Sequence, residues 1–302
     1  PVLDSLRLNL DAGDPASYGG SGTTWTDLSG FGNNATWQVA PTFDTSTAGG
    51  TFNLNGSSQY AKANTVKSDV FTVEVWARFN SLPNTHACLV ADEYQVTPIN
   101  YAICFWQNGK IRGGYWTSGT GWIVTGEFTP VINTWYQFTY SVSKVGLDWV
   151  GSLYVNGSLV TGISTTRTAP TSSERGTRIG LRWDGTAEII SGSIPVVRIY
   201  NRALSTSEIT QNYNALRPRF TNNPSNVITI TTTESVTASS SIFYAGLGTG
   251  DKTFALSNAT AGISIDSSTV NTVRVNLANS LTASSTTCLL YTSPSPRDRT
   301  RS

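Results

Sequence analysis

The segment Phe71-Thr-Val-Glu-Val-Trp-Ala-Arg-Phe79 alternates between two sets of side chains along its length. Successive side chains of a β-strand point to opposite faces, so this pattern predicts a strand with one apolar face. One face would carry Phe71, Val73, Val75, Ala77 and Phe79, and the other Thr72, Glu74, Trp76 and Arg78. The segment is typical of a sheet that contributes one face to a hydrophobic core.

The same alternation recurs along the chain, between Gly-, Asn- and Ser-rich turns. Residues 135–142 form a second such strand, and Asn108-Gly109 and Asn156-Gly157 predict two tight hairpins of type I′. One helical pattern starts after Ser205, where Glu208 completes a capping box, and Arg217-Pro218 should end it. The sequence therefore predicts an all-β, two-sheet sandwich closed by a short helix.

Composition limits the classes of function. Charged residues make up 13% of the 302, and 20 Lys and Arg nearly balance 19 Asp and Glu, so no basic surface for nucleic acid is expected. No apolar run approaches the roughly 20 residues of a membrane-spanning helix, so no membrane insertion is expected. The chain begins at Pro1 and contains no methionine, which indicates part of a larger multidomain protein.

A change of composition near Phe220 predicts a domain boundary. All nine tryptophans precede it, and the residues that follow are rich in Ser, Thr and Asn with short strand patterns such as 227–230, 252–256 and 273–275. We expect one domain at 1–219 and a second, incomplete β-sandwich module at 220–287. Residues 288–302 resemble a translated sequencing adapter and are set aside as an expected artefact.

Five motifs occur in an order that resembles a known family. They are Trp25-Thr-Asp-Leu-Ser-Gly-Phe-Gly-Asn-Asn34, Phe71-Thr-Val-Glu-Val-Trp76, Asn133-Thr-Trp135, Leu153-Tyr-Val-Asn-Gly157 and Val197-Arg-Ile-Tyr-Asn-Arg-Ala-Leu-Ser-Thr-Ser-Glu-Ile209. Residues 1–219 are similar to concanavalin A-like lectin/glucanase domains, and within them to the laminin G-like subgroup. The resemblance implies an antiparallel jelly roll, commonly a carbohydrate- or protein-binding module of secreted, cell-surface or virion proteins. Residues 220–287 resemble immunoglobulin- or cadherin-like repeats.

The same fold hosts glycoside hydrolases, which use two facing carboxylates. Glu74 is the best candidate here, but its neighbours on the same face are Thr72, Trp76 and Arg78. His86 is the only histidine, and no serine lies in a nucleophile elbow. We therefore expect a protein that is not an enzyme, with a glycoside hydrolase as the less favoured hypothesis.

Two further features have alternative interpretations. Asp27, Asn33 and Asn34 offer oxygen ligands in a Gly-rich loop, which makes the loop a candidate calcium site. A hydrogen-bonded turn without an ion is the favoured alternative, because the loop holds a single carboxylate. Cys88 and Cys104 are expected to be buried thiols, although a cross-strand disulfide would form if their strands were adjacent and would indicate an oxidising compartment.

A ligand-binding face follows from the hairpin at Asn108-Gly109. A two-residue turn would pair Gln107 with Lys110, Phe105 with Arg112 and Tyr101 with Trp116, leaving Ala102, Cys104, Trp106, Ile111 and Tyr115 as the core face. The predicted outward set is Tyr101, Phe105, Gln107, Lys110, Arg112 and Trp116, extended by Trp76 and Trp122. Aromatic rings beside polar donors suit a sugar.

The leading hypothesis is a non-catalytic carbohydrate-recognition or adhesion module of an extracellular, cell-surface or virion protein, whose partner is a glycan or a surface protein. The alternative is a structural spacer or fibre module with no ligand of its own.

Overall fold

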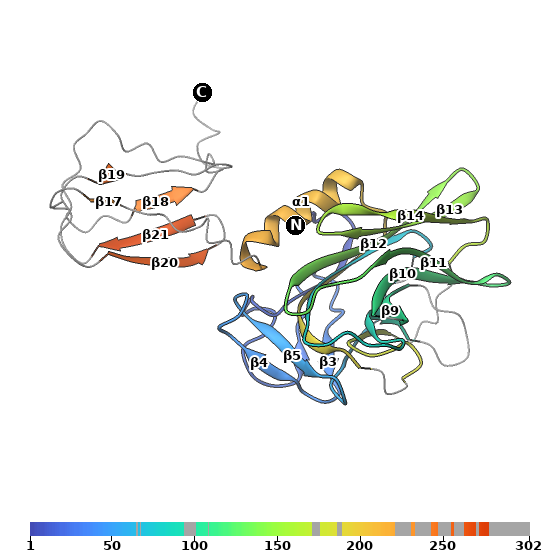
Figure 1. Ribbon diagram of the computed structural model, residues 1–302, viewed down its shortest axis with the longest axis horizontal. Helices are drawn as coiled ribbons and strands as arrows, with labels where there is room; N and C mark the ends of the chain where they lie inside the picture. Colours follow the sequence, from blue (N-terminus) through green and yellow to red (C-terminus); the bar gives the residue numbers. More distant parts are fainter. Residues whose placement is uncertain are drawn as a thin grey trace, which may run out of the picture. The chain divides into compact units, whose positions relative to one another are not determined.

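The computed structural model describes residues 1–64, 66, 68–93, 101–107, 109–170, 176–185 and 189–220, and isolated strands in the remainder. The chain divides into two compact units, Pro1–Phe220 and Thr221–Ser302 (Figure 1). The first unit is a sandwich of two antiparallel sheets with one helix among its described residues.

The first sheet contains eight strands. They are β1 (Leu6–Asp11), β4 (Thr42–Asp44), β5 (Thr51–Asn55), β7 (Phe71–Phe79), β12 (Trp135–Val145), β13 (Asp148–Val155), β14 (Ser158–Thr166) and β16 (Ser191–Tyr200). Their order is β14-β13-β12-β7-β16-β5-β4, with β1 also paired to β16. The Asn156-Gly157 turn joins β13 to β14 with positive φ at both residues, as a type I′ turn requires.

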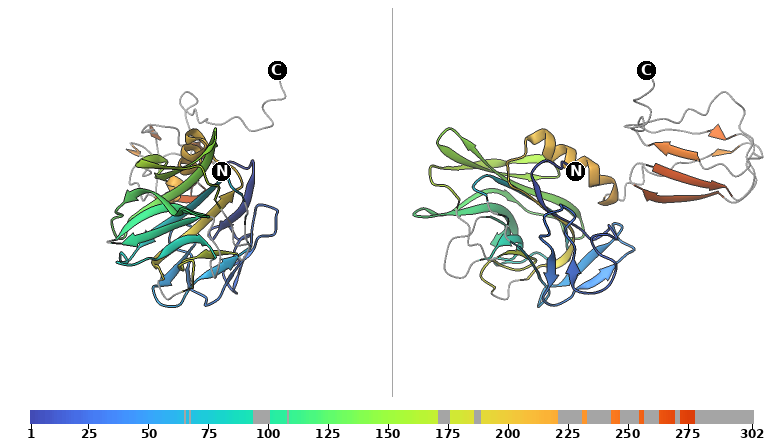
Figure 2. Two further views of the ribbon diagram at one scale, coloured as in Figure 1. Left: turned by 90° about the vertical axis from the view of Figure 1, so that its right-hand side faces the viewer. Right: turned by 180° about the vertical axis from the view of Figure 1, so that it is seen from behind.

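The second sheet also contains eight strands. They are β2 (Thr24–Trp25), β3 (Ala35–Trp37), β6 (Ala61–Ala63), β8 (Cys88–Asp92), β9 (Ala102–Gln107), β10 (Lys110–Thr117), β11 (Gly121–Phe128) and β15 (Thr177–Ile179). Their order is β11-β10-β9-β8-β15-β6-β3-β2. Figure 2 shows the two layers from the side and from behind.

The core lies between the two sheets, and β7 contributes the face that its sequence predicts. Phe71, Val73, Val75, Ala77 and Phe79 are all completely buried. Rings from the two sheets meet there: the Phe79 centroid lies 4.9 Å from that of Phe105. Gly113 of β10 is a glycine because a Cβ atom there would come within 2.1 Å of the Tyr140 ring. The inward face of β7 is thus part of a core to which both sheets contribute.

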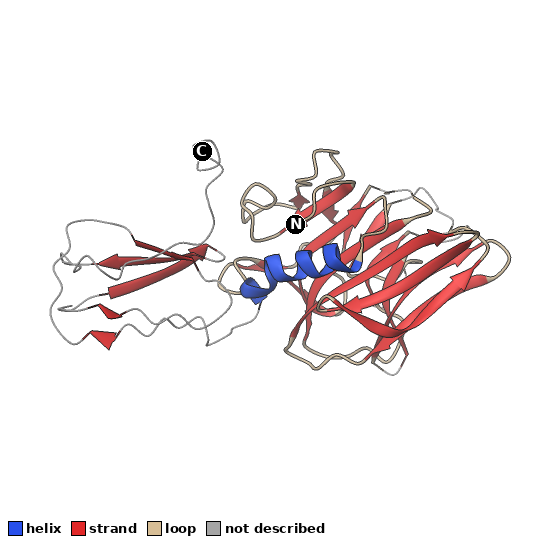
Figure 3. Cartoon of the chain, turned by 90° about the horizontal axis from the view of Figure 1, so that it is seen from above, coloured by secondary structure: helices blue, strands red, loops and turns tan. Residues whose placement is uncertain are grey.

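The helix α1 (Thr206–Phe220) lies against the outer face of the first sheet (Figure 3). Its predicted capping box is confirmed, because the Ser205 amide donates to the Glu208 carboxylate at 2.8 Å. The predicted end before Pro218 is wrong. Arg219 binds Asp11 at 2.5 Å and Phe220 stacks on Trp76 with ring centroids 4.1 Å apart, and these contacts stabilise the last turn past the proline.

The second unit contributes five short strands to the description. They are β17 (Thr231–Thr232), β18 (Phe243–Gly246), β19 (Ala255–Leu256), β20 (Ile263–Thr269) and β21 (Thr272–Leu277). β18, β21 and β20 form an antiparallel sheet, and β17 pairs with β19 in parallel. The strand predicted at 227–230 and residues 288–302 lie outside the described residues, and the immunoglobulin- or cadherin-like assignment stays a prediction.

No helix in the described part of the chain is long and apolar enough to cross a membrane.

Candidate functional site

The hairpin between β9 and β10 differs from its predicted register after one residue. Lys110 pairs with Gln107 as expected, but a bulge follows, so that Ile111 pairs with Phe105 and Arg112 with Cys104. A shift of one residue exchanges the two faces of a strand. The side chains of β9 therefore point opposite to the prediction, while those of β10 keep the predicted orientation.

The predicted binding residues of β9 are consequently part of the core. Tyr101 and Phe105 are completely buried, and the Tyr101 hydroxyl shares a 2.5 Å hydrogen bond with Thr177. Their outward placement was wrong because the bulge carries no signature in the sequence. The Gln107 side chain lies outside the described residues.

Four tryptophans form an aromatic layer on the outer face of the second sheet. Trp106 comes from β9, Trp116 from β10, Trp122 from β11, and Trp183 from the loop after β15. Trp122 is central: its ring centroid lies 5.6 Å from Trp106, 5.9 Å from Trp116 and 5.0 Å from Trp183. Trp183 is buried, whereas the other three rings are partly exposed.

The aromatic layer rests on small side chains. Beneath it lie Cys88, Ala91, Ala102 and Cys104, all buried. At Gly114 a Cβ atom would approach the Trp122 ring to 3.3 Å, so the missing side chain allows that indole to lie across β10. This floor explains why the layer forms: only small residues leave room for four indoles on one sheet face.

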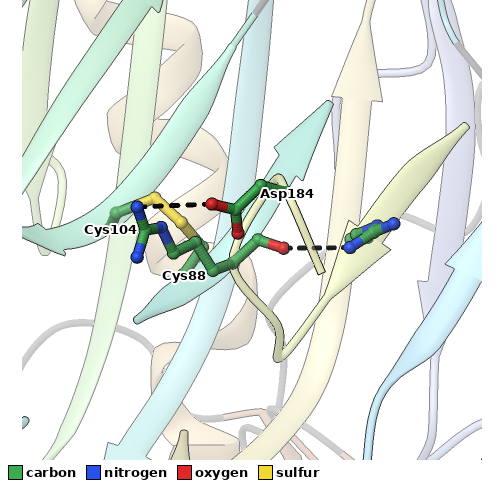
Figure 4. The surroundings of a disulfide bond; sticks show 5 residues. Cys88, Cys104 and Asp184 are labelled. Carbon is green, nitrogen blue, oxygen red and sulfur yellow. Dashed lines mark hydrogen bonds and ion pairs between the residues drawn. A yellow bond between two sulfur atoms is a disulfide. The ribbon is translucent and has the colours of Figure 1, made fainter. Parts of the chain in front are cut away.

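The two cysteines of the floor form a disulfide. Cys88 pairs directly with Cys104 across β8 and β9, and the bond joins their sulfur atoms (Figure 4). The favoured expectation of two buried free thiols is therefore wrong, and the alternative, a cross-strand bridge between adjacent strands, is confirmed.

An ionic chain, buried at Arg178 and Glu93, supports the loop that carries Trp183. Glu93 accepts hydrogen bonds from Arg178 at 2.6 Å and from Lys62 at 3.0 Å, and Arg178 also donates to the Arg182 carbonyl at 3.3 Å. Burial alone would raise the pKa of Glu93, but the bonds from the two cations hold it below its ordinary value. The Arg182 guanidinium lies over the Trp183 ring, 5.0 Å from its centroid, and pairs with Asp184 at 3.3 Å.

Charged side chains lie on the same outer face of the second sheet as the aromatic layer, because Arg112 pairs with Cys104 of its floor. Lys110 and Arg112 both bind the Glu127 carboxylate, and all three side chains are partly exposed. Hydrogen bonds from these two cations lower the pKa of Glu127. Arg112 and Trp116 thus lie on the outer face that the sequence predicts, and Trp122 joins them.

Sequence reasoning missed Trp106 and Trp183. Trp106 was assigned to the core by the register error. One sequence signal could have corrected this: Ala102 and Cys104, on the same face as Trp106, are small residues that leave room for a large ring to pack over them. Trp183 could be placed only by the fold, because its loop reaches the layer through tertiary contacts.

Trp76 and Glu74 lie elsewhere, on the outer face of the first sheet under α1. Trp76 is 1% exposed and stacks on Tyr213 and Phe220, so its predicted place in the binding face was wrong. The completely buried Glu74 pairs with Arg198 at 2.9 Å and accepts a second hydrogen bond from Asn212 at 2.9 Å. The candidate catalytic carboxylate is therefore part of a buried ion pair that holds the helix.

The loop of Asp27, Asn33 and Asn34 closes on itself. Asp27 accepts hydrogen bonds from the amides of Asn9, Ser29 and Asn33 and from the Ser29 hydroxyl, at 2.7–2.9 Å. Asn34 accepts from the Asp27 amide, and the Asn33 side chain donates to the Arg7 carbonyl. These bonds are those of the favoured Asx-turn interpretation. Among the described residues no group of three or more His, Cys, Asp or Glu side chains could hold a metal ion, and the calcium site stays a prediction.

Residues 53–210 match the family model of the concanavalin A-like lectin/glucanases superfamily. The match spans half of the sequence, and the chain belongs to this superfamily. No curated protein sequence matches the chain.

Solved structures share the fold. Domain 4 of an extracellular GH43 arabinanase from Geobacillus stearothermophilus, in complex with arabinotriose, has a TM-score of 0.54 and 17% identity, covering 68% of this chain and 97% of that domain. The receptor-binding domain of botulinum neurotoxin type G has a TM-score of 0.54 and 20% identity, covering 70% of this chain and 51% of that one. Trypanosoma rangeli sialidase, in complex with the inhibitor DANA, has a TM-score of 0.50 and 17% identity, covering 71% of this chain and 33% of that one. The chain thus spans about half of the toxin domain and a third of the sialidase, and likeness at these identities shows the fold.

Proposed function

We propose that residues 1–220 form a non-catalytic carbohydrate-recognition domain whose ligand binds on the outer face of the second sheet. The observation that carries the proposal is the aromatic layer, in which Trp106, Trp116 and Trp122 stay partly exposed. Indole rings attract the C–H face of a sugar, and the neighbouring Arg112 and Glu127 supply the hydrogen-bonding groups that hydroxyls need.

The similar structures support a glycan ligand. The arabinanase domain was solved with arabinotriose, and the toxin domain is named for receptor binding. The superfamily also contains glucanases, and the sialidase is an enzyme, so the family alone leaves catalysis open. The burial of Glu74 against Arg198 supports a binding role over hydrolysis, because that carboxylate does not reach solvent.

The proposed setting is extracellular, on a cell surface or on a virion. The Cys88–Cys104 disulfide supports it, because such bonds persist in oxidising compartments. The partner would be a glycan or a glycosylated surface protein, and the chain would act within a larger assembly of domains. Calcium bound near Asp27 remains part of the proposal as a separate, testable element.

The test is a glycan array with the full chain, in calcium and again in excess chelator, followed by calorimetry on each hit. We expect saturable binding that falls at least about tenfold in Trp116→Ala and Trp122→Ala, as for the loss of an aromatic contact. Trp135→Ala is the matched control, because Trp135 is a partly buried tryptophan that packs under the helix on the other sheet.

Three results would contradict the proposal in different ways. A folded chain that binds no glycan would favour the structural spacer. Hydrolysis of a bound glycan would favour the hydrolase. Binding that is equal with calcium and with chelator would remove the Asp27 loop as a calcium site while leaving the aromatic layer in place.

A further inference from the structure

The disulfide occupies a special position under the aromatic layer. Cys88 is the first residue of β8, and the pairing of β8 with β9 shifts between Cys88 and Val90, so the regular ladder is interrupted immediately after it. A bulge leaves a residue out of the ladder and weakens the local pairing. The covalent bond to Cys104 therefore fixes this end of β8 where hydrogen bonding alone is discontinuous.

The next side-chain pair beyond the disulfide joins His86 to Trp106 of the aromatic layer. His86 lies two residues before Cys88, and Trp106 lies two residues after Cys104, so an antiparallel pair places both rings on the same face. Their ring centroids are 4.9 Å apart, and His86 also lies 5.7 Å from the Trp183 ring. One backbone hydrogen bond of 2.7 Å, from the Phe105 amide to the Ala87 carbonyl, accompanies this pair.

The layer in turn covers the disulfide. Cys88 and Cys104 are at most 1% exposed and share one apolar cluster with the four tryptophans. Asp184, from the loop that carries Trp183, also lies beside the bond (Figure 4). We therefore expect movement of Trp106 or Trp183 to change the access of a reductant to the sulfur atoms. Cleavage of the disulfide should in turn change the strand pairing that positions those two rings.

We propose that the Cys88–Cys104 disulfide is a redox control element of the aromatic layer, so that the oxidised chain presents the binding face and reduction disorders it. The inference rests on the proposed function for its consequence in binding. A dithiol reductant would act in two exchanges: one of its thiolates attacks a cysteine sulfur and releases the other cysteine as a thiol. The second thiol of the reductant then closes its own disulfide and frees the first cysteine.

The coupling between ligand binding and the redox state of the disulfide must operate in both directions. If the oxidised form binds a ligand more tightly than the reduced form, the ligand favours the oxidised form by the same factor. A tenfold preference corresponds to a reduction potential lowered by about 30 mV for this two-electron couple.

The first arm of the test needs no ligand. The full chain carrying Cys288→Ser, which leaves Cys88 and Cys104 as its two cysteines, is reduced with dithiothreitol, and the indole N–H resonances are followed by NMR. We expect the signals of Trp106, Trp122 and Trp183 to shift or broaden, while those of the core residue Trp25 and of Trp76 stay in place. Unchanged layer signals, or loss of every signal through global unfolding, would overturn the proposal.

Access to the bond gives a second measurement. In Trp183→Ala we expect the rate of reduction to rise by about tenfold, because access of the attacking thiolate limits exchange. Trp135→Ala is the control and should reduce at the parent rate. Equal reduction rates in the parent, Trp183→Ala and Trp135→Ala would show that the aromatic layer does not shield the disulfide.

The last arm uses the glycan found on the array. We expect the reduced chain and the Cys88→Ala/Cys104→Ala variant to bind it at least about tenfold more weakly than the oxidised chain. Saturating glycan should then lower the reduction potential of the disulfide by at least about 30 mV. Equal affinity of the oxidised and reduced forms would refute the redox control alone. If no glycan binds either form, the proposed function fails, and the indole spectra decide whether the disulfide controls the layer.

Discussion

The outer faces of both sheets carry tryptophans, but these differ in how far they are exposed to solvent. On the first sheet, Trp76 is sealed under α1 by Phe220 and Tyr213. On the second sheet, Trp116 and Trp122 lie on small side chains, and neighbouring indoles leave them partly exposed. Strand parity places all three tryptophans outside the core, so an outward tryptophan marks a binding face only where no further element covers it.

The charged residues of the two faces show the same contrast. Glu74 and Arg198 are buried under the helix and bind each other, with Asn212 completing the carboxylate's contacts. Glu127 binds Lys110 and Arg112 in a partly exposed cluster beside the aromatic layer. The first cluster serves packing of the helix, and the second remains partly exposed to solvent.

The largest expected effect separates the tryptophans of the two faces. Trp76→Ala should lower the free energy of unfolding by roughly 3–5 kcal/mol, because it opens a cavity under the helix. Trp116→Ala should cost only about 1 kcal/mol, because its ring is partly solvated already. Urea unfolding followed by circular dichroism measures both free energies of unfolding. Equal decreases in the two variants would contradict the conclusion that α1 buries Trp76 while Trp116 is partly exposed.

A somewhat smaller effect separates the two ionic clusters. Arg198→Met should destabilise the chain by about 3 kcal/mol, since it leaves the buried Glu74 carboxylate without the guanidinium that pairs with it. Glu127→Gln, on the exposed cluster, should leave the free energy of unfolding almost unchanged, because solvent screens exposed ion pairs. Denaturation midpoints at neutral pH test the pair, and a large loss in Glu127→Gln would show that the outer cluster is structural.

The smallest effect concerns acid sensitivity at the start of α1. Hydrogen bonds from Arg202, and then from the Ser205 amide, lower the pKa of Glu208 to about 2. The unfolded carboxyl titrates near about 4.3, so its ionised form stabilises the fold above that pH, and this contribution is lost as the pH falls toward about 2.

Because the Glu208 side chain is still 28% exposed, solvent screens its ion pair, and its contribution should stay below about 1 kcal/mol. Glu208→Gln should therefore flatten the acid limb of the stability profile between about pH 4.3 and pH 2, measured as melting temperature against pH. A variant whose acid limb matches the parent's would show that the pairing with Arg202 contributes nothing.

The fold itself was predictable from the sequence because its signals are local. Alternation along Phe71–Phe79 defined a strand and its buried face, Asn156-Gly157 defined a hairpin through its need for positive φ, and Ser205 with Glu208 defined where a helix begins. Each of these signals depends on backbone geometry or on a few adjacent residues.

The candidate site depended on information that no local pattern contains. A one-residue bulge after Lys110 moved Tyr101 and Phe105 into the core and brought Trp106 out, and the hairpin motif is compatible with either register. The helix runs past Pro218 because Arg219 and Phe220 find partners on the first sheet, and that extension buries Trp76.

The sequence by itself thus determined that this chain forms an antiparallel sandwich with a capped helix, since periodicity and turn chemistry act over neighbouring residues. Only the tertiary structure decided which outer face is open, that Cys88 meets Cys104, and that Trp183 joins three strand tryptophans. Those outcomes depend on strand register and on contacts between residues far apart in the chain, which are selected by the packing of the whole domain.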